Sequence, residues 1–201
     1  MLREQFIGRN PTHFVSNSIV RAFITSEIFL WSGWDAVVPL LAIFVVKNVP
    51  GGNIELAASA YSIYLVTRVI FELISGKRLA RSPESSKIYA ALFGLVFASI
   101  ACIGFAFVNY LPLLFLCYGV AGLGIGIASP AKNSLFSTHL DKNKEATQWG
   151  IYDAAVLVCI ALSTALAGFI ATAYGFRTLF VIAGLWILVG TIPYLLYLRK
   201  T

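Results

Sequence analysis

The chain has 201 residues, of which 59% are hydrophobic and 12% are charged, and its formal net charge is +6. Soluble globular domains have about 45–50% apolar and about 25% charged residues, so this composition excludes an ordinary soluble protein. The basic residues stand in short connectors between apolar stretches, and the net charge therefore gives no indication of a nucleic-acid-binding surface.

Six apolar stretches follow one another along the chain, and each is about long enough to cross a bilayer core of roughly 30 Å as a helix. A polar leader, residues 1–17, precedes a first stretch that is too long for the apolar region of a cleavable signal peptide. The sequence predicts an all-α membrane protein in which residues 1–201 form a single domain of six transmembrane helices. The predicted spans are 18–46, 56–75, 88–108, 113–136, 149–171 and 177–198.

The basic residues indicate how these spans cross the membrane. The leader, the connectors after the second and fourth spans, and the C-terminal tail all lie on one side of the predicted bundle. The opposite side has only Lys47 and Arg177. Positive residues mark the cytoplasmic side, so both termini are expected there. The expected location is a cell membrane, specifically the inner membrane of a bacterium, which the chain crosses several times. The residues that carry this bias are Arg3, Arg9, Lys77, Arg78, Arg81, Lys87, Lys142, Lys144, Arg199 and Lys200.

The first span holds two acids and two indoles. At about 100° per residue, Glu27, Trp31, Trp34 and Asp35 fall on one stripe of the helix. One interpretation is a cavity wall that binds a proton, a cation or an amphipathic solute, with the indoles stacking on it. The other is that the indoles pack and the acids pair with nearby bases. An ionised carboxylate facing lipid costs several kcal/mol, so both interpretations predict that the stripe faces inward.

The second span carries Arg68 near its middle and Glu72 one turn further on. That spacing permits an ion pair within one helix. Alternatively, Arg68 reaches Glu27 in the first span and holds or releases it as protons move.

Lys132 near the end of the fourth span and Asp153 near the start of the fifth are expected at similar depth, because a short loop joins these two helices. The sequence predicts a Lys132–Asp153 ion pair that acts as a gate or staple, with direct contact to substrate as the alternative. Four acids in the spans oppose two bases, which favours a cationic substrate or a protonated acid. Asp35 is the best candidate for protonation from outside.

Glycine and proline cluster in the first and fourth spans. Pro39 lies in the first, and Gly122, Gly126 and Pro130 lie in the fourth. Such glycines allow close helix packing, and proline removes a backbone hydrogen bond and bends a helix. Simple packing is one interpretation. The other is that these bends let the two spans rock during alternating access.

No pattern in the chain indicates an enzyme. His13 and His139 lie at the predicted cytoplasmic edge, where a single histidine is usually solvated. The three cysteines, Cys102, Cys117 and Cys159, fall inside apolar spans and are expected to be small buried residues. The sequence predicts neither a cofactor nor a metal site.

From the second span onward, three segments resemble the N-terminal half of a major facilitator superfamily transporter. The connector 76–87 is similar to the family's Gly-x-Leu-Ala-Asp-Arg loop, although the family's acidic residue is missing and Arg81 stands near its place. Residues 118–126 resemble an Arg-x-x-x-Gly-x-Gly-x-Gly pattern with Tyr118 in place of the arginine. Residues 150–180 resemble the fifth span and the turn after it, with Ser163-Thr164 where antiporters often have Gly-Pro.

The resemblance implies a half bundle built from two three-helix repeats, in which spans one and four line a cavity and spans two and five touch a partner. Since the family's members have two six-helix halves, we expect a parallel homodimer acting as a secondary active transporter of a small solute. Alternating access coupled to protons through Asp35 or Glu27 is the expected mechanism. The alternatives are a non-transporting membrane interaction protein, a half-transporter with a different partner chain, and a piece of a twelve-span protein.

Overall fold

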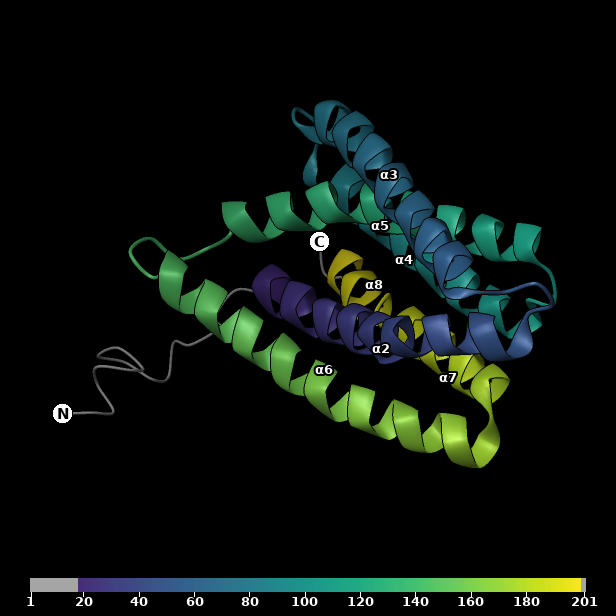
Figure 1. The fold of residues 1–201 in the computed structure, drawn as a ribbon. Coiled ribbons are helices and arrows are strands. Elements are labelled where there is room, and N and C mark those ends of the chain that lie inside the picture. Colours follow the sequence, from purple (N-terminus) through teal and green to yellow (C-terminus); the bar gives the residue numbers. More distant parts are fainter. Residues whose placement is uncertain (1–17, 200–201) are drawn as a thin grey trace.

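The computed structural model describes residues 18–199, and that part of the chain consists of helices and connecting turns without a strand (Figure 1). The leader residues Arg3, Arg9 and His13 and the tail residue Lys200 lie outside the described residues. The helices are α2 (Ser18–Asn48), α3 (Ile54–Leu79), α4 (Glu84–Gly104), η2 (Phe105–Phe107), α5 (Leu111–Thr138), α6 (Glu145–Tyr174), α7 (Phe176–Val189) and α8 (Ile192–Leu198).

These elements give six helices long and apolar enough to cross a membrane, with α4 joined to η2 and α7 joined to α8. The predicted number of spans is therefore confirmed for the described residues. Most helices run a few residues beyond the predicted bounds, in part because polar caps extend them past their apolar stretches, but α4 ends at Gly104, before the predicted bound at residue 108. At the start of α3, for example, the Leu56 N–H donates to the Asn53 side chain at 2.8 Å, which satisfies an otherwise free helix donor.

The sixth span, predicted over 177–198, is present as one span, Phe176–Leu198, with an irregular turn between α7 and α8. The Gly190 N–H donates to the Ile187 carbonyl at 3.0 Å, and the Thr191 hydroxyl donates to the Leu188 carbonyl at 2.7 Å. A new helix, α8, then begins with Pro193 in its first turn, where a missing N–H costs nothing. Turn bonds at Gly190 and Thr191 thus end α7 before α8 begins.

The helices alternate in direction and form two groups. α5 packs on α3 and α4, whereas α6 packs on α2 and α7, and α2 also contacts α8. α4 and α7 pack directly on each other and join the two groups. Figure 1 shows the start of α2, the end of α8 and the α3–α4 and α5–α6 connections at one end of the bundle, which we call the termini end. The last turn of α2, with Lys47, and the start of α7, with Arg177, lie at the opposite end, so the described basic residues of the connectors stay on one side. That the termini end faces the cytoplasm remains a prediction.

Glycines set the close contact between α5 and α3. A Cβ atom on Gly122 would lie 2.5 Å from the Tyr64 carbonyl oxygen, and one on Gly126 would lie 2.6 Å from the Arg68 carbonyl oxygen. Both positions are therefore packing contacts, and α5 continues through them without interruption. That Gly122 and Gly126 also serve as bends remains a prediction.

Pro39 and Pro130 lie inside α2 and α5, and each leaves a carbonyl four residues earlier without its helical donor. A hydroxyl from a neighbouring helix approaches each of these carbonyls. Thr164 of α6 donates to the Asp35 carbonyl at 3.5 Å, and Ser75 of α3 donates to the Gly126 carbonyl at 3.0 Å. Membrane helices tolerate proline when a neighbouring hydroxyl replaces the missing backbone N–H donor in this way.

Candidate functional site

A buried ion pair joins the two groups of helices. The Lys132 ammonium on α5 donates to Glu27 Oε1 on α2, and the two side chains are only 1% and 3% exposed. Removing two charges from water costs several kcal/mol per ion, and only direct pairing with further hydrogen bonds offsets that cost. The pair therefore needs additional partners, and Glu27 has them.

The second oxygen of the Glu27 carboxylate accepts two hydrogen bonds. Trp31 donates from its indole N–H at 2.8 Å, and Tyr152 of α6 donates from its hydroxyl at 3.2 Å. Glu27 is thus bound from α2, α5 and α6 at one point. Aromatic rings cover this point toward the termini end, since the Phe136 ring lies 4.3 Å from that of Phe23 and 5.7 Å from that of Tyr152.

Arg68 of α3 extends this cluster to a fourth helix. Its guanidinium carbon lies 5.6 Å from the centroid of Trp31, the indole that donates to Glu27. Arg68 Nε lies 3.5 Å from Glu72 Oε2, and its Nη1 donates to the Tyr64 hydroxyl at 3.2 Å. In contrast to the buried pair, Arg68 and Glu72 are 27% and 39% exposed. We call Glu27, Trp31, Arg68, Lys132 and Tyr152 the charged cluster.

The predicted Lys132–Asp153 ion pair needs correction, and of the two interpretations of Arg68 the pair within α3 is the one that forms. Lys132 pairs with Glu27 and not with Asp153, whose side chain is exposed on α6. The assumption that a short loop places α5 and α6 side by side fails, because these two helices pack on different neighbours. Arg68 forms the pair within its own helix, and Glu27 is taken by Lys132.

The aromatic stripe predicted on α2 also divides. Trp31 belongs to the charged cluster, but Trp34 is 2% exposed and packs in the core, with its ring 5.1 Å from that of Tyr64 and 6.5 Å from that of Phe105. Three residues of helix turn the second indole by about 60° relative to the first, which is enough to direct it into the core. Asp35 is half-buried, and among the described residues its carboxylate has no ion pair.

Sequence reasoning missed the two tyrosines of this region. Tyr64 was detectable, because it lies four residues before Arg68 on the same helix face. Tyr152 gave no signal, since Glu27 lies 125 positions away in the chain. The hydroxyls of Ser26 and Tyr194, also fully buried, have no hydrogen-bond partner among the described residues.

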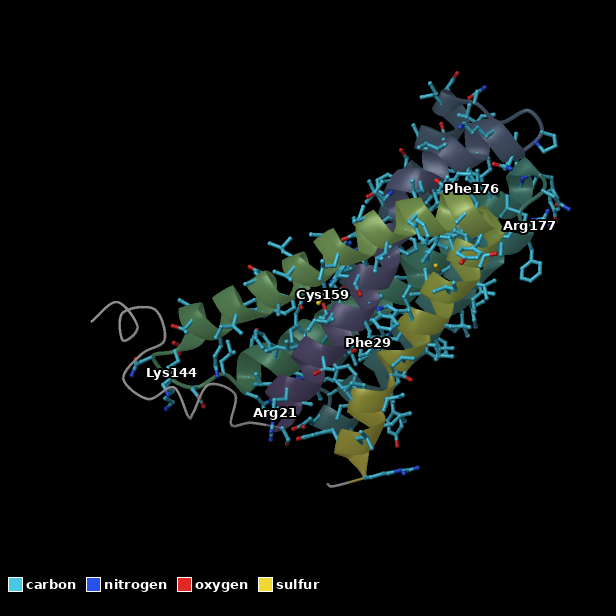
Figure 2. The ribbon with its side chains drawn as sticks, turned by 90° about the horizontal axis from the view of Figure 1, so that it is seen from below. Arg21, Phe29, Lys144, Cys159, Phe176 and Arg177 are labelled. Carbon is cyan, nitrogen blue, oxygen red and sulfur yellow. The ribbon has the colours of Figure 1, made fainter. Side chains whose placement is uncertain are left out.

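A cavity of about 320 Å³ lies between α2, α6 and α7, apart from the charged cluster. Its lining is apolar except for the hydroxyls of Ser32 and Ser163, and Cys159 lies beside it on α6 (Figure 2). The Trp186 indole N–H donates to the Ser32 hydroxyl at 2.9 Å. Within residues 18–199, no group of three metal-ligating side chains occurs.

Comparison with protein families gives a match to the Major Facilitator Superfamily over residues 23–201. The chain belongs to this superfamily. The match covers all of the charged cluster and every predicted span except the first residues of the first, and with the six apolar helices it makes the chain a multi-pass membrane protein.

Solved structures similar to this superfamily member share its fold. A crystal structure of the POT family transporter PepTSo matches with a TM-score of 0.78 at 15% identity, over 90% of this chain and 37% of the matched chain. An auto-inhibited POT family peptide transporter matches with a TM-score of 0.69 at 17% identity, over 92% and 38%. The chain thus spans less than two fifths of the structures it matches. No curated protein gives a significant match.

Proposed function

We propose that the protein is a secondary active transporter that works by alternating access as a parallel homodimer and is driven by protons. The observation that carries the proposal is the charged cluster, in which one buried carboxylate, Glu27, is shared by Lys132, Trp31 and Tyr152 from three helices. Protonating Glu27 would remove its attraction to Lys132 and loosen the only described ion pair that joins α2 to α5.

The balance of charge supports a cationic or amphipathic solute. Two of the four acids in the spans are paired, Glu27 with Lys132 and Glu72 with Arg68. Asp35 and Asp153 have no ion pair among the described residues. Two uncompensated carboxylates in a membrane protein attract a cation or take up protons, so Asp35 remains our candidate for protonation from outside.

The half-buried charges of α3 and the exposed charge of α6 support the homodimer. These two helices have few residues buried inside the subunit, yet they carry Arg68, Glu72 and Asp153. Lipid at this face would penalise such residues, whereas a second subunit in the same orientation would enclose them and complete a polar path. A different partner chain would satisfy the same requirement and is the alternative.

The transport proposal is tested with purified protein in liposomes. An inward proton gradient should drive flux of a fluorescent organic cation across the liposome membrane, and Glu27→Gln and Asp35→Asn should each abolish the flux. Glu145→Gln, which alters an exposed acid in the first turn of α6, is the matched control and should retain it. Flux that survives both Glu27→Gln and Asp35→Asn would contradict proton coupling.

The subunit proposal has its own test. Chemical cross-linking in native membranes should give a dimer, and Arg68→Glu should weaken it, whereas Arg177→Glu at the opposite end should not. A protein that stays monomeric under mild detergent and in membranes would contradict the homodimer.

The bound solute is sought by fluorescence. Trp31 lies beside Arg68 and Glu27, so a bound solute should quench it, and the quenching should disappear in Trp31→Phe but persist in Trp186→Phe. Because Trp34 is buried in the core, its contribution should not change.

A further inference from the structure

A second opening lies at the termini end, beside the break between α7 and α8 and apart from the charged cluster. It is a groove of about 490 Å³ between α2 and α8. Figure 2 shows Arg21 at the outer end of α2, and Phe29 further along the same helix beside α7. Both residues line the groove.

The helix break explains why a groove forms here. Gly190, directly after α7, lies against α2, since a Cβ atom there would lie 3.1 Å from Phe29 Cβ and 3.2 Å from the Ser26 carbonyl oxygen. The chain then turns through Thr191 and starts α8 with Pro193 in its first turn. The groove opens from this contact toward the termini end, with Pro193 in its wall.

Along its α2 wall the lining of the groove changes from polar to apolar, whereas the α8 wall is apolar at Ile192, Pro193 and Leu196. Ser18, Arg21 and Thr25 stand near the start of α2, and all three are exposed. Eight residues after Arg21, about 12 Å along the helix, the lining is Phe29. On the opposite wall, Val189 faces the inner part. A charged mouth above an apolar channel is the polarity profile of a single phospholipid.

Arg21 is the charged residue of the lining, and it makes no ion pair with any residue that the structure describes. The acid that meets the groove wall is Glu84. Its Oε1 accepts the Tyr197 hydroxyl at 2.6 Å, and its Oε2 lies 3.5 Å from His139 Nε2. Both oxygens of Glu84 are therefore engaged, and the guanidinium of Arg21 stays available to an anion.

We propose that this groove binds one anionic phospholipid, whose phosphate pairs with Arg21 and whose acyl chain lies against Phe29 and Val189. Basic pockets between transmembrane helices bind such headgroups. Free phosphate would meet the mouth alone and leave the apolar wall uncovered. A phospholipid covers both parts of the groove and would hold α8 against α2.

The test uses the purified full chain in a neutral detergent. Dioleoylphosphatidylglycerol is added, and the retained lipid is measured by native mass spectrometry together with the melting temperature. One molecule should be retained per chain, with a raised melting temperature. Dioleoylphosphatidylcholine and inorganic phosphate should give neither effect. Equal retention of the choline lipid, or stabilisation by phosphate alone, would overturn the proposal.

Variants locate the site. Arg21→Gln should weaken retention of the anionic lipid about five-fold, which corresponds to about 1 kcal/mol for one basic residue near anionic lipid. Arg199→Gln removes the same charge from an exposed position at the same end, outside the groove lining, and should leave retention unchanged. Thr25→Trp should block the groove and abolish retention. Equal loss in Arg21→Gln and Arg199→Gln, or full retention in Thr25→Trp, would overturn the site.

Discussion

In both the α3–α5 pair and the α6–α2 pair, a hydroxyl of one helix binds a carbonyl that a proline has left free in the other. The two pairs differ in how closely their helices pack. Gly122 and Gly126 bring α5 against the backbone of α3, and Ser75 donates to the Gly126 carbonyl at 3.0 Å. On α6, a Cβ atom added to Gly168 would meet no neighbouring atom within 4 Å, and Thr164 donates to the Asp35 carbonyl at 3.5 Å. The difference shows that α3 packs closely against α5 at its glycines, whereas Gly168 of α6 does not lie at a close helix contact.

The largest expected effect comes from breaking the Glu27–Lys132 ion pair, which connects α2 of one helix pair to α5 of the other. Lys132→Met leaves Glu27 as an unpaired buried carboxylate and should lower the free energy of unfolding by about 3–5 kcal/mol. The measurement is unfolding of the purified protein in mixed detergent micelles, and the control is Glu27→Gln combined with Lys132→Met. Removing both charges should recover most of the loss, so equal stability of the single and double variants would contradict the paired geometry.

A smaller effect is expected from adding a methyl group at the close contact between α3 and α5. Gly126→Ala forces a Cβ to within 2.6 Å of the Arg68 carbonyl oxygen, and overpacking of this kind costs about 1–3 kcal/mol. Gly168→Ala is the matched change on α6 and should be neutral or stabilising by up to about 1 kcal/mol, because alanine favours a helix and meets nothing. Thermal unfolding compares the two variants, and similar losses would contradict the close contact assigned to Gly126.

The hydroxyl bonds sharpen the same comparison. Ser75→Ala leaves the Gly126 carbonyl without a donor and should cost about 1 kcal/mol. Pro130→Ala restores the backbone N–H and should rescue the Ser75→Ala variant. Thr164→Ala should cost less than Ser75→Ala, since its bond is longer. A Ser75→Ala loss that Pro130→Ala does not reduce would contradict the assigned role of the hydroxyl.

The smallest effect concerns the charges of the outer helices. Glu72→Gln removes a partner that Arg68 holds within one helix and should cost about 0.3–0.5 kcal/mol. Asp153→Asn removes a charge that has no ion pair among the described residues and should leave stability unchanged. Unfolding of both variants is compared with that of Arg68→Gln, and a larger loss for Asp153→Asn would show that this carboxylate has a partner beyond the described residues of one subunit.

What could be predicted from the sequence was local. Span number and the Arg68–Glu72 pair depend on residues within one helix, so composition and spacing are enough to identify them. The break after Val189 also had a local signal, a glycine followed three residues later by Pro193, which the span prediction overlooked.

The remaining features depend on contacts between distant segments. Glu27 meets Lys132 across 105 positions of sequence, and its approach depends on which neighbours α5 and α6 choose. A loop of a few residues does not determine that choice. Periodicity also could not separate Trp31 from Trp34, because it gives the direction of a side chain and not the neighbour it meets.

The proline carbonyls of α2 and α5 have a consequence for motion. If α6 swings away from α2, the Asp35 carbonyl loses the Thr164 hydroxyl and must find another donor, because an unsatisfied carbonyl in hydrocarbon costs several kcal/mol. Water is the donor at hand, so this separation is favourable only when the crevice between the two helices becomes wet. Hydration next to Asp35 and outward movement of α6 are thereby tied to one event, and a dry crevice keeps α6 shut.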